Sequence, residues 1–248
     1  MWRRGWPPPC RRWVARRWVA RRWAVHRWKG LRMPMPAEVW TRRAHRFAFL
    51  GNSLLAPMTA DAALGLDEAF WHKFAAGEVE GPSIRRALER LKAYARAAQA
   101  DGTVLEDAVR RVNVEYARLF IGPPKPAAPP WETMYAQAGQ VGKIGFGRAT
   151  VAMQNLLAEA GLVLANENNQ YADHLGIELL YLAELCHCCA AGADGADAER
   201  RLRTFVREHP VAWAPAFRDQ VATAAPGGYY APLADLVVAL LEELETPH

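Results

Sequence analysis

Apolar residues recur at three- and four-residue intervals through most of this chain from Ala37 onward, and this spacing is typical of amphipathic helices. In one such segment, Ile84, Leu88, Leu91 and Tyr94 fall on a single helical face. Strong helix formers dominate, and β-branched runs with alternating polarity are absent from the sequence. The pattern therefore predicts an all-α fold.

The loops between the predicted helices are short, which favours antiparallel neighbours packed as a single-domain helical bundle. Residues 122–130 differ, because they contain five prolines. Proline fixes φ and removes a backbone donor, so we expect a stiff, extended connector there. The predicted helices cover residues 47–55, 81–100, 104–119, 147–160, 173–190, 196–208, 212–224 and 229–245.

Charge divides the chain into two parts. Residues 1–32 hold eleven of the 31 Lys and Arg and no acidic residue, so the net charge of +5 divides into +11 there and −6 over residues 33–248. An acidic domain argues against nucleic acid as its main partner. No apolar run is long enough to cross a bilayer, and four cysteines do not make a secreted disulfide framework in a chain of 248 residues. We therefore expect a cytoplasmic protein without membrane insertion.

The basic segment repeats Arg-Arg-Trp at five-residue intervals, with Trp13, Trp18 and Trp23 in step. Five residues advance a helix by about 500°, so these side chains form no stripe that could be buried. We expect residues 1–34 to be a disordered, low-complexity extension or a mis-assigned translation start, and the folded domain to span residues 35–248. A membrane- or nucleic-acid-binding arm is the alternative interpretation.

Two clusters suggest other chemistry. In the cluster Cys186-His187-Cys188-Cys189, only Cys186 and Cys189 share a helical face, so core packing is favoured over a metal or redox site. The glycine-rich stretch from Gly142 to Gly147 could cradle a phosphate, but no apolar strand precedes it, and a helix-to-helix loop is favoured. A metal- or nucleotide-binding helical protein that uses either cluster is the alternative function.

Three further segments are more informative: residues 115–122, 129–135 and 169–178. Asp173 is a reasonable N-cap for the helix that follows it, which would place His174 in the first turn, where the helix dipole disfavours a cation. The segments also carry aromatic residues at the edges of the proline connector. Such residues suit an apolar platform with polar tips that grips a peptide or ligand, although capping and core packing account equally well for each residue alone. The aromatic residues are Tyr116, Phe120, Trp131 and Tyr135.

These segments read E-Y-x-R-L-F-x-G-P, P-P-W-E-x-x-Y and D-H-x-x-x-E, and together they resemble the TorD/DmsD family of redox-enzyme maturation chaperones. The resemblance covers about residues 37–246. It extends to the C-terminal helices, where His209-Pro210, Trp213, Phe217 and Tyr229-Tyr230 stand at family-like spacing.

The resemblance implies an all-helical cytoplasmic chaperone that is not an enzyme and needs no cofactor. Such a chaperone binds the twin-arginine signal peptide or the apoprotein of a molybdenum-cofactor oxidoreductase, and holds it until the cofactor is inserted before export. Its partners would be the catalytic subunit of that oxidoreductase, with its leader, and cofactor-insertion proteins.

The resemblance also implies roles for individual residues. Asp173 would pair with the arginines of the leader, Leu119, Phe120 and Trp131 would cover its apolar run, and His174 would bind its backbone. The implied peptide-binding positions are Tyr116, Leu119, Phe120, Trp131, Asp173 and His174. The positions expected to support the site are Glu115, Arg118, Glu132, Tyr135 and Glu178.

Within the supporting set, Glu115, Arg118 and Glu132 are expected to form ion pairs that hold the connector, and contact with the leader is the alternative. The chain departs from the family pattern at Tyr171, where many relatives have proline, so we expect the loop before Asp173 to be looser here.

Overall fold

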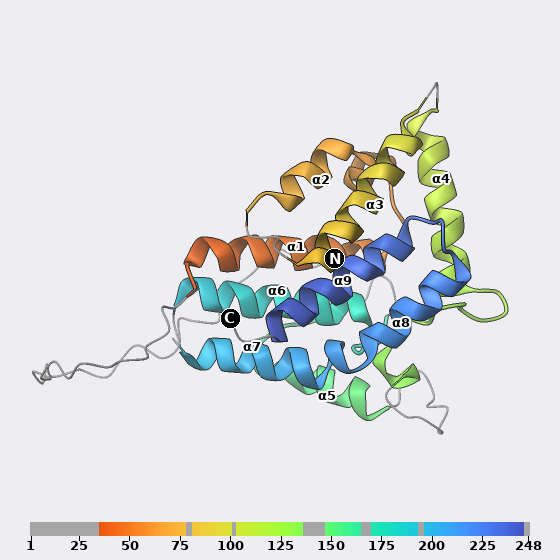
Figure 1. Cartoon of the computed structure of the whole chain (residues 1–248). Helices are drawn as coiled ribbons and strands as arrows, with labels where there is room; N and C mark the ends of the chain where they lie inside the picture. Colours follow the sequence, from red (N-terminus) through yellow and green to blue (C-terminus); the bar gives the residue numbers. More distant parts are fainter. Residues whose placement is uncertain are drawn as a thin grey trace, which may run out of the picture.

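The computed structural model describes residues 35–77, 81–100, 103–135, 147–164, 170–192 and 196–245. Within these ranges every regular element is helical, apart from one isolated bridge between Trp131 and His174, so the all-α prediction is confirmed. None of the described helices combines the length and the apolarity that crossing a membrane requires. The α-helices are α1 (Ala37–Leu55), α2 (Glu68–Ala75), α3 (Pro82–Ala98), α4 (Leu105–Tyr116), α5 (Arg148–Glu159), α6 (Leu175–Ala191), α7 (Ala196–Glu208), α8 (Pro210–Ala224) and α9 (Tyr230–Glu245) (Figure 1).

The antiparallel pair α1 and α6 forms the centre of the bundle (Figure 1). Residues 175–183 of α6 are all buried, as expected for a helix with neighbours on every side. The two helices approach most closely at Gly51 and Gly176, because a Cβ on Gly51 would lie only 2.7 Å from the carbonyl oxygen of Gly176. Small residues at this crossing therefore let the backbones pack directly together.

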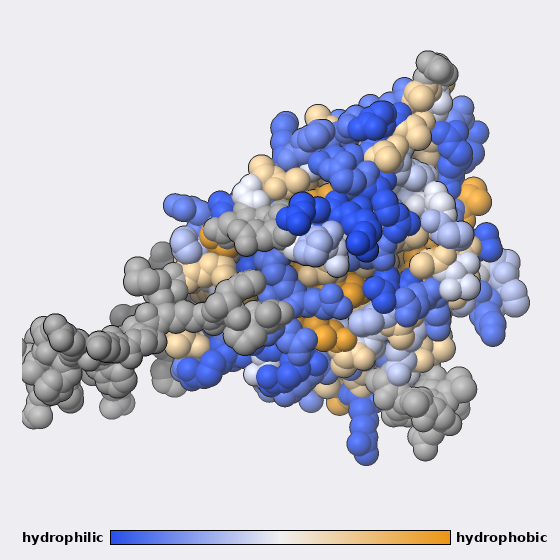
Figure 2. Space-filling model, in the orientation of Figure 1, coloured by the Kyte–Doolittle hydropathy of each residue, from blue (hydrophilic) through white to orange (hydrophobic). Residues whose placement is uncertain are grey.

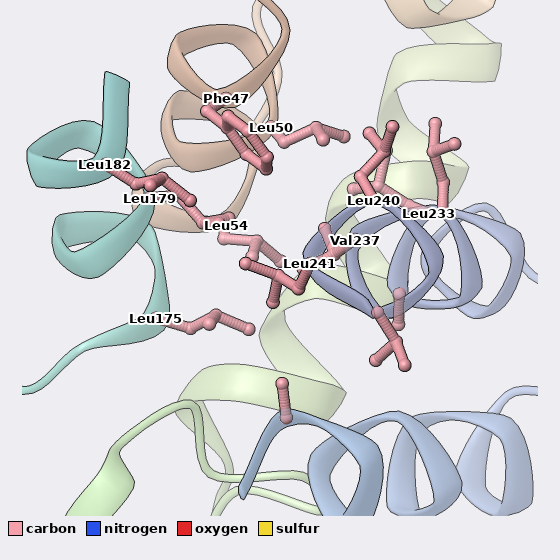
Figure 3. Packing of buried hydrophobic residues seen from close by; sticks show 14 of the residues in the cluster. Phe47, Leu50, Leu54, Leu175, Leu179, Leu182, Leu233, Val237, Leu240 and Leu241 are labelled. Atoms are coloured by element: carbon pink, nitrogen blue, oxygen red, sulfur yellow. The ribbon is translucent and has the colours of Figure 1, made fainter. Parts of the chain in front are cut away.

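The C-terminal helix α9 completes the core. Val237 and Leu241 of α9 point toward Leu54 at the end of α1 (Figure 3). Helices α3 and α8 pack against α9, and Asp235 of α9 forms an ion pair with Arg90 of α3. Hydrophilic side chains cover much of α2, α3 and α7 on the face seen in Figure 2, as expected for the outward faces of amphipathic helices.

Each predicted helix has a counterpart in the structure, with ends that differ by a few residues apart from the first, which begins ten residues earlier, at Ala37. The sequence interpretation missed α2, a helix of eight residues whose Trp71 is fully buried. It also missed the change in helical pitch at the end of α4, where residues Ala117–Ile121 form a π-helix.

The expectation of an extended connector at residues 122–130 is wrong, because the chain turns back on the end of α4. The backbone N–H of Ala128 donates to the carbonyl of Leu119 at 2.9 Å. The turn depends on Gly122, whose φ is +88°, and a Cβ there would lie 2.7 Å from the carbonyl carbon of Lys125. This fold-back brings the connector against the π-helix.

Candidate functional site

The three motif segments, which are far apart in the sequence, meet beside the end of the α1–α6 pair. A short antiparallel bridge joins two of them: the N–H of Glu132 donates to the carbonyl of Asp173, and the N–H of Leu175 donates to that of Pro130, both at 2.9 Å. The third segment reaches the same place through the folded-back connector. Main-chain hydrogen bonds therefore assemble the site.

Asp173 is fully buried at the centre of this junction. Its carboxylate accepts hydrogen bonds from the backbone N–H of Thr133 at 3.1 Å, from the Thr133 hydroxyl, and from the Thr150 hydroxyl at 2.9 Å. The sequence did not reveal these two threonines. Thr133 lies inside a recognised motif but carries no charge, and no sequence signal marks Thr150.

The prediction that Asp173 caps α6 is wrong. The helix begins one residue later, and His174 is the N-cap, because its Nδ1 accepts the backbone N–H of Gly176 at 2.9 Å. Burial lowers the pKa of His174 to about 3, so the ring is neutral and Nδ1 is free to accept.

The indole of Trp131 packs edge-to-face on the His174 ring, with centroids 5.8 Å apart. Its Nε1 is buried and has no hydrogen-bond partner among the described residues. Most buried indole N–H groups find an acceptor, so a buried indole donor with none among the described residues is unusual.

The expected aromatic platform lies inside the protein rather than on its surface. Tyr116, Leu119 and Phe120 are at most 4% exposed. Phe120 stacks on Phe217 of α8 at 5.9 Å and meets Tyr230 of α9 edge-to-face at 5.0 Å. Burial also raises the pKa of Tyr116 to about 12. In this conformation these side chains join α4 to the C-terminal helices.

The expected ion-pair set is divided between two places. Glu115 accepts the backbone N–H groups of Tyr229 and Tyr230 at 2.9 Å each, at the start of α9. Burial raises the pKa of Glu115, while these two hydrogen bonds and the charge of the exposed Arg118 act in the opposite direction. Glu132 lies elsewhere and pairs with His209 at 2.9 Å, between its Oε2 and Nδ1 of the ring.

Glu178 and Tyr135 complete the supporting set on the other side of Glu132. Glu178 is fully buried, and its Oε2 accepts the indole N–H of Trp213 at 3.2 Å. Burial and the neighbouring charge of Glu132 hold the pKa of Glu178 well above its ordinary range. Tyr135 stacks on Trp213 with ring centroids 5.2 Å apart and donates to Gln220 at 3.0 Å.

The two alternative clusters lie away from this junction or outside the described residues. Cys186 is buried in the core, where burial raises its pKa, and the pKa of Cys189 is raised to about 11 for the same reason. Among the described residues, no three His, Cys, Asp or Glu side chains are grouped so that they could hold a metal ion. Of the glycine-rich stretch, only Gly147 is described, and it packs against Thr133. The basic segment 1–34 lies outside the described residues.

Comparison with known proteins gives one family match. The family model described as nitrate reductase delta subunit matches residues 80–219, more than half of the chain, and this stretch contains all three motif segments.

Two curated relatives are chaperones. The chain is 28% identical over 137 residues to the Tat proofreading chaperone DmsD of Haemophilus influenzae, and this match covers 54% of this chain and 60% of that protein. It is 30% identical over 143 residues to the chaperone protein TorD of Escherichia coli, and this match covers 56% of this chain and 65% of that protein. The matched part thus spans about three fifths of the length of these relatives.

One solved structure, described as a redox enzyme maturation protein from Archaeoglobus fulgidus, aligns with 73% of this chain and 93% of its own. The two chains are 22% identical, and the TM-score is 0.37.

Proposed function

Because this chain belongs to the TorD/DmsD family of redox-enzyme maturation chaperones, we propose that it binds the twin-arginine leader or the apoprotein of a molybdenum-cofactor oxidoreductase. It holds that client until the cofactor is inserted, and it acts in the cytoplasm, before export. Its named relatives are chaperones rather than enzymes. The observation that carries the proposal is the meeting of the three motif segments around Asp173.

The leader binds where segment 130–135 meets the start of α6. Trp131 is the most exposed of the proposed contacts, at 9%. Its indole N–H has no partner within the described part of the chain and suits a peptide carbonyl. Tyr116, Leu119 and Phe120 form the apolar layer beneath, and His174 binds the peptide backbone.

Asp173 receives an arginine of the leader once segment 130–135 moves aside. The guanidinium then replaces the donors that Thr133 supplies. A charge-assisted contact of this kind contributes about 1.5–3 kcal/mol when it is partly desolvated. The surrounding domain favours the encounter, because residues 33–248 carry −6 and the leader is cationic.

The supporting residues position this site from outside it. Glu115 fixes the start of α9, and Glu132, Tyr135 and Glu178 connect segment 130–135 to α6 and α8. Arg118 is exposed beside Glu115 and weakens the negative potential there.

A labelled twin-arginine leader peptide tests the proposal by fluorescence anisotropy with the full chain. We expect binding that weakens at least tenfold when both arginines are replaced by lysine, because lysine cannot make the bidentate contact. The variant Trp131→Phe removes a donor that has no partner among the residues the structure describes, so it should weaken binding without unfolding. Trp40→Phe, near the opposite end of α1, is the matched control.

A pull-down from lysate of the source cells with the tagged full chain, read by mass spectrometry, names the client. Recovery of a molybdenum-cofactor oxidoreductase subunit that bears a twin-arginine leader supports the function. If no such subunit is recovered and no leader peptide binds, the function is wrong. If the peptide binds equally well to Trp131→Phe and Trp40→Phe, the contact assigned to Trp131 is wrong.

A further inference from the structure

Segment 130–135 covers the proposed leader site and is held on two sides. On the side of α6, the N–H of Glu132 donates to the carbonyl of Asp173 at 2.9 Å, and the N–H and hydroxyl of Thr133 donate to its carboxylate. Asp173 and His174 are at most 1% exposed in this arrangement. A leader therefore reaches them only after the segment has moved.

His209 holds the segment from the other side. Nδ1 of its ring lies 2.9 Å from Oε2 of Glu132. A carboxylate oxygen can only accept, so Nδ1 donates this hydrogen bond. The two side chains are 14% and 9% exposed, so water competes little for the contact. The side chain of Glu132 is thus tied to the corner between α7 and α8.

That corner fixes the orientation of the His209 ring. Pro210 has no N–H with which to continue the hydrogen-bond ladder of α7, and α8 begins at this residue. The N–H of His209 donates to the carbonyl of Phe205 at 3.0 Å, and the two rings stack with centroids 5.2 Å apart. The imidazole is therefore held in place independently of Glu132.

The two sides of the segment differ in what a leader can replace. An arginine at Asp173 offers donors in place of those of Thr133, so the hydrogen bonds on the side of α6 are exchanged. Movement of the segment also separates Glu132 from His209, and a leader at Asp173 does not restore that contact. The contact therefore stabilises only the closed position of the segment.

We propose that His209 is a positioning residue that locks segment 130–135 over Asp173 and His174 and so restrains entry of the leader. The inference rests on the proposed function, since it describes the regulation of the same site. The leader binds the open form, so its apparent dissociation constant is the intrinsic value divided by the open fraction. Weakening the lock tightens leader binding, whereas loss of a merely structural contact does not.

Two variants of His209 separate the hydrogen bond from the ring stacking. His209→Phe keeps an aromatic ring on Phe205 and removes the donor to Glu132. His209→Asn removes the ring and keeps a side-chain N–H near the position of Nδ1. The matched control is His72→Phe on α2, because His72 also pairs with a glutamate, Glu68, at 3.6 Å, but is exposed.

Amide hydrogen exchange of the free, full-length protein measures the opening of the segment. The reporters are the amides of Glu132, Thr133 and Leu175, whose hydrogen bonds join the segment to the start of α6. We expect their protection to fall about ten- to hundredfold in His209→Phe, since a hydrogen bond to a charged group is lost. Protection should stay near that of the wild type in His209→Asn and His72→Phe, and protection in α1 should be the same in all four proteins.

Stopped-flow fluorescence anisotropy with a labelled twin-arginine leader peptide measures the consequence for binding. In His209→Phe we expect the association rate to rise, and the apparent dissociation constant to fall, by about the factor that the exchange experiment gives. The dissociation rate should change little. His209→Asn should bind like the wild type.

The lock is wrong if His209→Phe leaves the three reporter amides as protected as in the wild type, or if His209→Asn exposes them equally. It is also wrong if the reporters open in His209→Phe while the leader binds no faster and no more tightly. If the leader binds to none of these proteins, the proposed function fails, and the exchange of the free protein still decides whether His209 holds the segment.

Discussion

Replacing the two threonines that donate to Asp173 should cost a large part of the stability of the domain. Thr133 and Thr150 are 3% and 1% exposed, and each hydroxyl bonds to the buried carboxylate. Valine has nearly the same shape, so Thr133→Val and Thr150→Val remove the donors and leave the packing in place. A hydrogen bond to a charged group contributes about 1.5–3 kcal/mol, so each variant should lose about that amount.

The double variant should lose more than the sum of the two single variants. Of the donors that the described residues give this carboxylate, the double variant keeps only the backbone N–H at position 133, and a buried charge with one donor is costly. The expected loss of at least about 3–6 kcal/mol compares with about 5–15 kcal/mol for the total stability of a typical domain.

Urea unfolding at pH 7, followed by circular dichroism, measures these losses. Thr41→Val is the control, since its exposed hydroxyl bonds only to a carbonyl within α1, and it should change stability by no more than about 0.5 kcal/mol. In an Asp173→Asn background, Thr133→Val and Thr150→Val should each cost less than in the wild type. Losses that match the control, or that are unchanged in this background, would refute the reasoning.

Three further predictions concern the helices around the site. Gly51→Ala should lower the free energy of unfolding by about 1–3 kcal/mol, because its Cβ would lie 2.7 Å from the carbonyl oxygen of Gly176. Gly227→Ala is the control, because a Cβ there meets no atom within 4 Å. Equal melting temperatures for the two variants would contradict this prediction. Glu115→Ala should lose about 2–4 kcal/mol of stability in urea unfolding, since two amides at the start of α9 lose their acceptor. The stability of Glu115→Gln should lie between those of the wild type and the alanine variant. An alanine variant as stable as the wild type would exclude the capping role. Because the unfolded state binds a proton on His174 first, the free energy of unfolding should fall by up to about 1.4 kcal/mol per pH unit as the pH falls from 6.5 toward the folded pKa of about 3. The variant His174→Asn keeps a capping acceptor and should lack this slope when unfolding is measured from pH 7 to pH 4. An equal slope in both proteins would assign the pH dependence to another group.

The helices were predictable because amphipathic spacing is a local property of the sequence. The exception is α2, in which Phe70, Trp71 and Phe74 lie within eight residues, too few for a periodic pattern to be recognised. The path of the connector was not predictable either. Its prolines indicated stiffness, but its direction depends on Gly122 and on hydrogen bonds back to the π-helix.

The motifs located the site but not the orientation of its side chains. Tyr116 and Phe120 read equally well as a surface platform or as core, and the choice depends on Phe217 and Tyr230, about a hundred residues later in the chain. The helix cap was misassigned for the same reason. Asp173 has the side chain of a good N-cap, but donors from outside its own segment hold its carboxylate.

The pairing of α1 with α6 affects the order in which the protein can fold during its synthesis. During synthesis α2 can reach Phe49 of α1 early, but the part of α1 that packs on α6 has no partner there until α6, which ends at Ala191, has left the ribosome. Helix α3 likewise gains its contacts with α9 only at the end of synthesis. Contacts between segments so far apart form slowly, because long loops must close before any packing rewards them. Until then the nascent chain presents amphipathic helices with exposed apolar surface, the state in which proteins aggregate most readily. A protein of this architecture is therefore prone to aggregation before its synthesis is complete.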